Sequence, residues 1–310
     1  MSPPRVSVAI PIYNEEEGIP ELLRRTGAVL DALPGGPHEI VLVDDGSADR
    51  SLELLEAAAS GDPRLVVVSL SRNFGHQAAI CAGIDTARGD VVVVMDGDLQ
   101  DSPEAIPEFL RVHAEGYDVV YARRVRRKEG MLLRFCYFLF YRLMASLSSI
   151  KVPLDAGDFS LMSRRVVDAL KATPERLRFV RGLRSWVGFR QIGIEVERAE
   201  RHAGEPKYGP IKLLKLAFDG IFAFSMVPLR AAAVLGAFAI AGSVLFSLYA
   251  VYKRLVLGHS PEGFTALLLA VVFLAGVQLL FLGLIGEYVG RVYEEAKGRP
   301  VYVIGRIVRR

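Results

Sequence analysis

Residues 90–101 read DVVVVMDGDLQD, and this stretch decides the fold of the first part of the chain. Its uninterrupted apolar run predicts a short strand that is buried on both faces, as the strands of parallel sheets are. Asp96 and Asp98 follow directly, separated by a single glycine. We therefore predict a buried strand that ends in a pair of carboxylates.

Three more apolar runs precede this strand, and helical patterns lie between them. The strand-like runs are Val6–Ile12, Glu39–Val43 and Leu65–Leu70, and the helical ones are Glu15–Leu33, Ser51–Ser60 and Asn73–Arg88. Strands that alternate with helices predict a doubly wound α/β domain with a parallel sheet. Ligands of such sheets bind at the carboxyl ends of the strands, which is where the polar residues of this sequence gather.

The first two strands also run into polar segments, PIYNEE at residues 11–16 and DDGSAD at residues 44–49. Neither G-x-G-x-x-G nor a P-loop follows any strand, which argues against a nicotinamide dehydrogenase and a P-loop nucleotidase. Ser47 or Asp49 is expected to cap the helix that begins near Ser51. Asp45 is expected to point into the cleft and accept a hydrogen bond from a nucleobase.

The acidic pair predicts a divalent metal site. Asp96 and Asp98 lie close enough to repel one another unless a cation sits between them. Two carboxylates that act together with substrate phosphates are the usual environment of Mg²⁺, and Gln100 can add an amide oxygen. We therefore expect Asp96, Asp98 and Gln100 to hold Mg²⁺ or Mn²⁺.

The last third of the chain predicts a membrane anchor. The whole chain is 51% hydrophobic with a mean hydropathy of +0.30, and the excess is concentrated there. Ala231–Tyr252 and Phe264–Gly286 are uncharged runs of 22 and 23 residues, and about 20 suffice to cross a bilayer. The short link between them predicts an antiparallel hairpin with both of its ends on one side of the membrane.

Basic clusters at 123–128 and at the C-terminus favour the cytoplasm for that side, although Lys253 and Arg254 in the opposite loop count against it. The N-terminus lacks the apolar region of a signal peptide. We expect an inner-membrane protein whose catalytic domain and termini are cytosolic. Glycines in both spans permit packing between protomers as a homo-oligomer.

Two further apolar segments, Met131–Ile150 and Ile211–Ser225, contain charged residues and are expected to lie in the membrane interface as amphipathic helices. Cys81 and Cys136 have no partners at metal-ligand spacing, so neither a zinc site nor a disulfide framework is expected. The expected organisation is a nucleotide-binding core at 1–130, the rest of the catalytic domain at 131–225, two transmembrane helices at 226–290 and a cytoplasmic basic tail at 291–310.

Seven motifs in order resemble one known family. They are PIYNEE, VDDGSAD, LSRNFGHQAAICAGID, MDGDLQDSPE, DAGDFSLMSRR, RGLRSWVGFRQ and AGEPKY, and the similarity continues through GEYVGRVYEEAKGRPVY near the C-terminus. Together they resemble the family 2 polyprenyl-phosphate glycosyltransferases of the GT-A fold, which include GtrB-type bactoprenol glucosyltransferases and dolichyl-phosphate mannose synthases. Gly97 stands where that family commonly has alanine.

The resemblance implies an inverting transfer of a hexose to a polyprenyl phosphate such as undecaprenyl phosphate, with membrane lipids as further partners and no nucleic acid. UDP-glucose is the first expected donor and GDP-mannose the second. A processive polysaccharide synthase, a transferase with a soluble acceptor and a non-enzymatic nucleotide-binding protein stay open as alternatives. The implied roles are a nucleoside site of Pro11, Tyr13, Glu15 and Asp45, a diphosphate contact by Arg123 and Arg124, catalysis by Asp158 as base with Asp98, and acceptor binding by Arg201 and Lys207.

Overall fold

The computed structural model describes residues 5–124, 156–173, 175, 178–196, 227–257 and 263–309. The chain forms two compact units. The first comprises Met1–Ala145, Ile150–Ile211 and Arg299–Arg310, and the second comprises Ser146–Ser149 and Lys212–Gly298.

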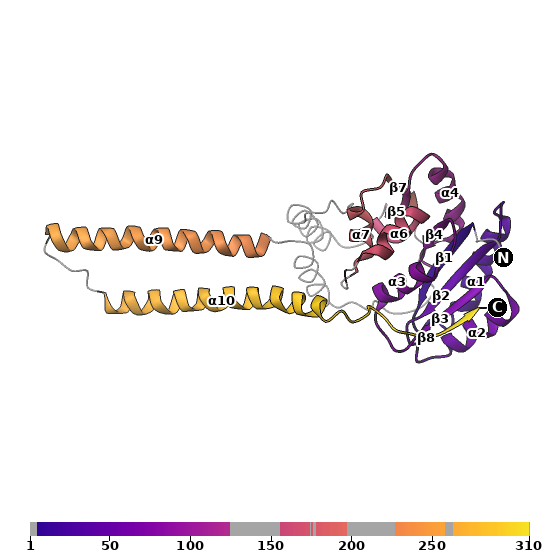
Figure 1. Ribbon diagram of the computed structural model, residues 1–310, viewed down its shortest axis with the longest axis horizontal. Helices are drawn as coiled ribbons and strands as arrows, with labels where there is room; N and C mark the ends of the chain where they lie inside the picture. Colours follow the sequence, from indigo (N-terminus) through magenta and orange to yellow (C-terminus); the bar gives the residue numbers. More distant parts are fainter. Residues whose placement is uncertain are drawn as a thin grey trace. The chain divides into compact units, whose positions relative to one another are not determined.

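The first unit is built on an eight-stranded sheet with the order β7-β5-β6-β4-β1-β2-β3-β8 (Figure 1). Its central strands β3, β2, β1 and β4 are parallel, as the alternating pattern predicts. The strands are β1 Val6–Ile12, β2 His38–Asp44, β3 Leu65–Leu70, β4 Val91–Val94, β5 Val119–Arg124, β6 Ala156–Ser163, β7 Gln191–Val196 and β8 Ile304–Arg309. The α/β fold class is therefore confirmed.

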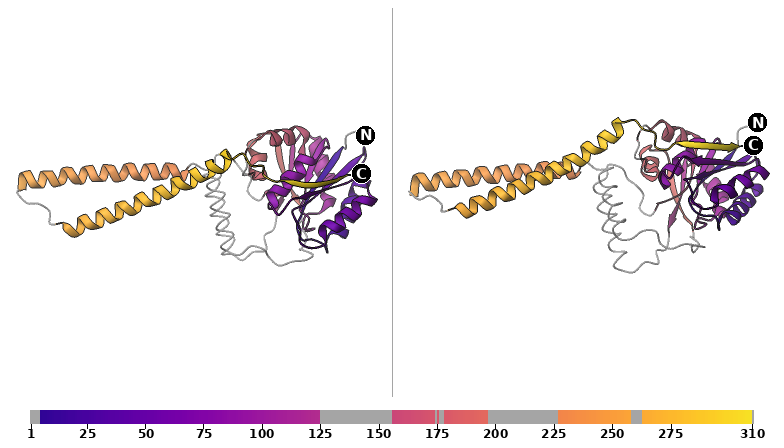
Figure 2. Two further views of the ribbon diagram at one scale, coloured as in Figure 1. Left: turned by 60° about the horizontal axis from the view of Figure 1, so that its bottom comes forward. Right: turned by 90° about the horizontal axis from the view of Figure 1, so that it is seen from below.

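Helices cover both faces of this sheet (Figure 2). One face carries α1 Ile19–Ala32, α2 Ser51–Gly61 and α4 Ile106–Ala114, with the short turn η1 Pro103–Ala105 before α4. The other carries α3 His76–Thr86, α6 Arg164–Ala172 and α7 Val180–Trp186. Successive residues of β1 point to opposite faces, so Val8 and Ile10 pack with the first group of helices and Ala9 with the second.

The close approach of α3 to the sheet depends on small residues. A Cβ atom on Gly83 of α3 would lie only 3.0 Å from the Cβ of Ala9 in β1. Any larger pair at these positions would push α3 outward. The small residues thereby let α3 pack closely against β1.

Beyond β4 the sheet changes direction. β6 pairs antiparallel with β4, β5 pairs antiparallel with β6, and β7 pairs parallel with β5. The register aligns Val94 of β4 with Ser160 of β6. Continued by two residues, the same register places Asp96 opposite Asp158, although 62 positions separate them in the sequence.

The last strand comes from the far end of the chain. β8 pairs antiparallel with β3 at the edge of the sheet, and the Tyr302 hydroxyl donates a hydrogen bond to Asp85 Oδ2 of α3 at 2.6 Å. The segment 291–310, which we expected to be a basic tail, therefore contains a sheet strand. Its six residues, IGRIVR, carry two arginines and give little strand signal from composition alone.

The second unit contains two long helices, α9 Val227–Leu257 and α10 Phe264–Ala296. Within them, Ala232–Lys253 and Ala270–Ala296 are each long and apolar enough to cross a membrane, with a mean hydropathy of 2.1. Both predicted spans lie in these helices, and α10 continues ten residues past Gly286. The two segments predicted to be interfacial, Met131–Ile150 and Ile211–Ser225, lie outside the described residues.

Candidate active site

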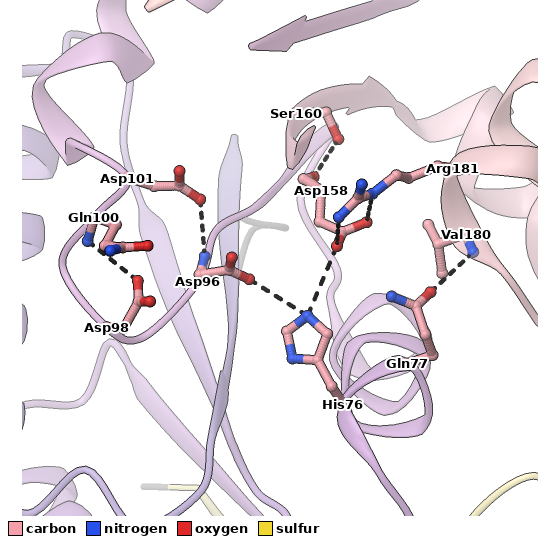
Figure 3. Close-up of polar contacts among 10 residues, drawn as sticks. All are labelled: His76, Gln77, Asp96, Asp98, Gln100, Asp101, Asp158, Ser160, Val180 and Arg181. Carbon is pink, nitrogen blue, oxygen red and sulfur yellow. Dashed lines mark hydrogen bonds and ion pairs between the residues drawn. The ribbon is translucent and has the colours of Figure 1, made fainter. Parts of the chain in front are cut away.

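The acidic loop after β4 carries Asp96, Asp98, Gln100 and Asp101 (Figure 3), and its backbone conformation is unusual. Leu99 has a φ of 58°, in the left-handed region that a leucine rarely adopts, while its side chain is buried in the core. Asp98 Oδ1 accepts a hydrogen bond from the Gln100 amide at 3.1 Å, and Asp101 Oδ2 accepts one from the Asp96 amide at 3.4 Å. Burial of Leu99 and these two bonds fix the loop that carries the predicted metal ligands.

Gly97 packs this loop onto the end of β1. A Cβ atom there would lie 2.9 Å from the carbonyl oxygen of Pro11 and 2.7 Å from Cδ1 of Ile12. The absence of a side chain thus allows the acidic loop to touch the segment that begins the predicted nucleoside site. Two motifs about 85 positions apart in the sequence are in direct contact.

The residues of the loop fit a hard divalent cation. They offer two carboxylates, of Asp96 and Asp98, and the amide oxygen of Gln100. Among the residues that the structure describes, no group of three His, Cys, Asp or Glu side chains is arranged to hold a metal ion by itself. A cation held here therefore completes its coordination with water or with oxygens of a bound substrate, as Mg²⁺ commonly does.

Asp45 lies at the end of β2 and is only 3% exposed. Burial raises the pKa of its carboxyl, although the hydrogen bonds that it accepts from the Phe74 amide at 2.7 Å and the Gly75 amide at 2.9 Å oppose this shift. Asp45 thereby fixes the loop before α3. Each carboxylate oxygen can accept a second hydrogen bond, so the predicted contact with a nucleobase stays a prediction.

The loops after β1 and β2 bind each other through side chains. Asn14, with a φ of 53°, accepts a hydrogen bond from the Ala48 amide at 2.8 Å. Asp49 accepts one from the Ser51 amide, the first of α2, at 3.0 Å and another from the Glu16 amide at 3.2 Å. Of the other residues predicted for the nucleoside site, Pro11 is buried within β1, Tyr13 is 40% exposed, and the Glu15 amide donates to Ser51 Oγ at 3.0 Å.

Asp158 of β6 is buried, and both of its oxygens bind Arg181. Arg181 Nε donates to Oδ1 at 2.6 Å, and Nη2 donates to Oδ2 at 2.6 Å. Burial alone would raise the pKa of Asp158, but Arg181 and the neighbouring His76 outweigh it and hold the pKa well below its usual range. A carboxylate held this way is a weak proton acceptor, which bears directly on its implied role as base.

His76 connects Asp158 with the acidic loop (Figure 3). Its Nε2 atom lies 3.5 Å from Asp96 Oδ1 and 3.7 Å from Asp158 Oδ2, and its side chain is 47% exposed. Burial lowers the pKa of His76, but Asp158 and Asp96 together outweigh this and raise it. The ring lies between two carboxylates that come from different strands.

Sequence reasoning missed His76 and Arg181 as members of this cluster. Both lie inside quoted motifs, His76 in LSRNFGHQAAICAGID and Arg181 in RGLRSWVGFRQ. The pairing of β4 with β6 brings Asp158 near the acidic loop, but His76 and Arg181 come from α3 and α7, and no sequence signal identifies them. That pairing joins segments far apart in the chain and leaves no local pattern.

The basic residues predicted to bind a diphosphate or the acceptor are described only in part. Arg123 Nη2 binds Glu195 Oε1 at 2.7 Å across β5 and β7, and both side chains are about half exposed. The backbone of Arg124 belongs to β5, while its side chain, Arg201 and Lys207 lie outside the described residues. Contacts of these four residues with a diphosphate or an acceptor stay predictions.

This chain belongs to glycosyl transferase family 2, whose model matches residues 7–171, more than half of the 310 residues. The matched region contains the acidic loop, Asp45, His76 and Asp158. The protein is therefore a glycosyltransferase enzyme, as the sequence motifs indicate, and the non-enzymatic alternative is wrong.

Similar proteins match along nearly the whole chain. YkcC of Bacillus subtilis (strain 168), an uncharacterized glycosyltransferase, is 44% identical over 96% of this chain and 92% of its own length. The SfII prophage-derived bactoprenol glucosyl transferase of Shigella flexneri is 41% identical over 97% of each chain. The undecaprenyl-phosphate 4-deoxy-4-formamido-L-arabinose transferase of Pseudomonas paraeruginosa (strain DSM 24068 / PA7) is 43% identical over 98% of this chain and 90% of its own.

Proposed function

We propose that this enzyme transfers a hexose from a nucleotide sugar to the phosphate of a polyprenyl phosphate such as undecaprenyl phosphate, at the cytoplasmic face of the inner membrane. The proposal rests on one observation, that two features occur in the same chain. The cluster of Asp96, His76 and Asp158 lies at the carboxyl end of a family 2 sheet, and α9 and α10 are long enough to span a bilayer. Full-length relatives named for bactoprenol and undecaprenyl phosphate support the lipid acceptor.

The reaction is a single displacement with inversion. An oxygen of the lipid phosphate forms a bond to the anomeric carbon while the bond from that carbon to the nucleoside diphosphate breaks. A phosphate monoester is largely ionised near neutral pH, so the attack needs no strong base. The low pKa of Asp158 suits this reaction, because its role is then to orient Arg181 and the acceptor rather than to remove a proton.

Asp96, Asp98 and Gln100 are the residues that would hold Mg²⁺ or Mn²⁺. Such a cation supplies charge stabilisation to the departing diphosphate when it is bound. The interlocked loops after β1 and β2, the second of which contains Asp45, would form one wall of the nucleoside site.

UDP-glucose is the donor we propose first, and GDP-mannose is the second candidate. Overall identity does not decide the sugar, because relatives at 41% and 43% identity are named for glucose and for 4-deoxy-4-formamido-L-arabinose. The bactoprenol glucosyl transferase match favours glucose. The choice between sugars has to be measured.

The link between α10 and β8 supports the proposed topology. Seven residues separate Ala296, the end of α10, from Ile304, the start of β8. Eight steps of at most about 3.6 Å reach roughly 29 Å, whereas a bilayer with its headgroup regions is roughly 40 to 45 Å thick. A link of this length is too short to recross a bilayer, which is consistent with the cytoplasmic placement that we propose for the sheet.

The test incubates the purified full chain with radiolabelled UDP-glucose or GDP-mannose, with and without undecaprenyl phosphate, and counts lipid-extractable label. We expect label from UDP-glucose only when the lipid is present, as a lipid carrying one sugar. Transfer to a water-soluble acceptor without the lipid, or a growing glycan, would overturn the proposal. Asp96→Ala and Asp98→Ala should abolish transfer under saturating Mg²⁺ or Mn²⁺, and near wild-type transfer would overturn the metal assignment.

A further inference from the structure

His76 is placed so that one ring nitrogen serves two carboxylates. Nε2 lies 3.5 Å from Asp96 Oδ1 and 3.7 Å from Asp158 Oδ2. An ionised carboxylate only accepts hydrogen bonds, so the nitrogen between two of them has to carry the proton. The surroundings thus select the tautomer of His76 that is protonated at Nε2.

Asp158, the second carboxylate beside the His76 ring, is held firmly in place. Asp158 is 4% exposed and is held by two 2.6 Å bonds from Arg181 of α7. Gln77, the next residue after His76, accepts a hydrogen bond from the Val180 amide at 3.1 Å and ties the first turn of α3 to the start of α7. The ring therefore has a fixed support, whereas Asp96 stands at the start of a loop.

Groups that orient the ligands of a metal commonly stand one shell outside it and hold a ligand atom by a hydrogen bond. We infer that His76 is a positioning residue of the metal site: its Nε2 atom, in ion-pair contact with Oδ1 of Asp96, keeps that carboxylate in place, while Asp158 and Arg181 hold the ring. This inference rests on the proposed metal site of Asp96 and Asp98. It assigns to Asp158 a second task, the support of the metal site, which neither the motifs nor the family match supplies.

The test measures binding of Mn²⁺ to the purified full chain without donor or lipid, by the electron paramagnetic resonance signal of free Mn²⁺. We expect His76→Ala to weaken binding about 10- to 100-fold, the usual effect of losing an outer-shell partner. The amide nitrogen of a glutamine side chain lies near the position of histidine Nε2, so His76→Gln should bind Mn²⁺ within about 3-fold of the wild-type affinity. The amide nitrogen of asparagine lies near Nδ1 instead, so His76→Asn should bind as weakly as His76→Ala. This rescue distinguishes positioning from a general loss of structure.

Asp158→Asn should also weaken Mn²⁺ binding, and His76→Ala with Asp158→Asn should bind no more weakly than His76→Ala alone, because both act through one ring. His113 of α4 binds the Tyr117 carbonyl through Nδ1, so His113→Gln serves as the matched control and should leave binding unchanged. Thermal melts of each variant show whether it is folded.

Unchanged or tighter Mn²⁺ binding by His76→Ala would overturn the inference, and tighter binding would mean that the ring competes with the cation. Additive effects in the double variant, or a wild-type chain that binds no Mn²⁺, would overturn it too. The proposed function is judged separately, by transfer of labelled sugar to lipid, so the two fail by different measurements.

Discussion

Asp45→Asn tests whether this carboxylate is a structural support of the site. The change keeps the shape of the side chain but replaces one acceptor oxygen by an NH₂ group. That group then faces the amide of Phe74 or of Gly75, which now lie 2.7 and 2.9 Å from the two oxygens. One hydrogen bond to a charged group is lost, and two donors are brought together in a site that is 3% exposed.

A hydrogen bond to a charged group contributes about 1.5 to 3 kcal/mol, and an unsatisfied buried donor costs about 1 to 3 kcal/mol. Burial of the carboxylate is itself unfavourable, as the raised pKa of Asp45 shows, so the neutral amide recovers part of this cost. We expect a net loss of about 2 to 4 kcal/mol. For a domain of this size, each kcal/mol lowers Tm by about 2 to 4 °C, which gives a fall of about 5 to 15 °C.

The assay is thermal unfolding of the purified full chain, followed by circular dichroism at neutral pH. Asp31→Asn is the control, because Asp31 forms an exposed ion pair with Arg64, and exposed pairs contribute about 0 to 1 kcal/mol. A Tm for Asp45→Asn within 1 °C of wild type would refute the reasoning. It would show that the loop before α3 is held by something other than this carboxylate.

Three other changes have defined outcomes. Ser7→Ala should lower the free energy of unfolding by about 1 to 3 kcal/mol in chemical denaturation. The buried Ser7 hydroxyl accepts a hydrogen bond from the Gly89 amide and donates one to Glu39, each at 2.6 Å, and the variant loses both. An unaltered denaturation midpoint would contradict this network. Cys81 is buried with its pKa raised to about 11, so iodoacetamide at pH 8 should label it, by peptide mass spectrometry, only after denaturation, and rapid native labelling would contradict this. A chain ending at Val303 lacks β8, so its Tm should be lower and it should aggregate through the opened edge of β3, which light scattering would detect. An unchanged Tm would show that the strand is dispensable.

The local sequence pattern was sufficient to predict the strands at the centre of the sheet. The continuous apolar runs of β1 and β3 predict these strands at their observed bounds, because both faces of a central parallel strand are buried. The placement of Asp96 and Asp98 followed from the rule that ligands bind at the carboxyl ends of such strands. Those parts of the site depend on residues near one another in the sequence.

The remaining parts depend on pairings between distant segments. Asp158 and Asp96 lie beside the same His76 ring because β6 enters the sheet antiparallel beside β4, and no periodicity predicts that neighbour. His76 and Arg181 reach the site from α3 and α7, and their contacts with Asp158 likewise depend on the packing of distant segments. β8 was missed because a strand that pairs on one edge needs little apolar sequence of its own, and arginines are common at such edges.

The position of β8 in the sequence determines when the sheet can be completed during synthesis. β3 emerges early and β8 last, with both long helices made between them. Because β8 follows both long helices in the chain, the edge of the sheet at β3 has no neighbouring strand there until α9 and α10 have been synthesised. Completion of the sheet therefore follows synthesis of both long helices, and a chain that stops before β8 keeps an open sheet edge that quality control can recognise.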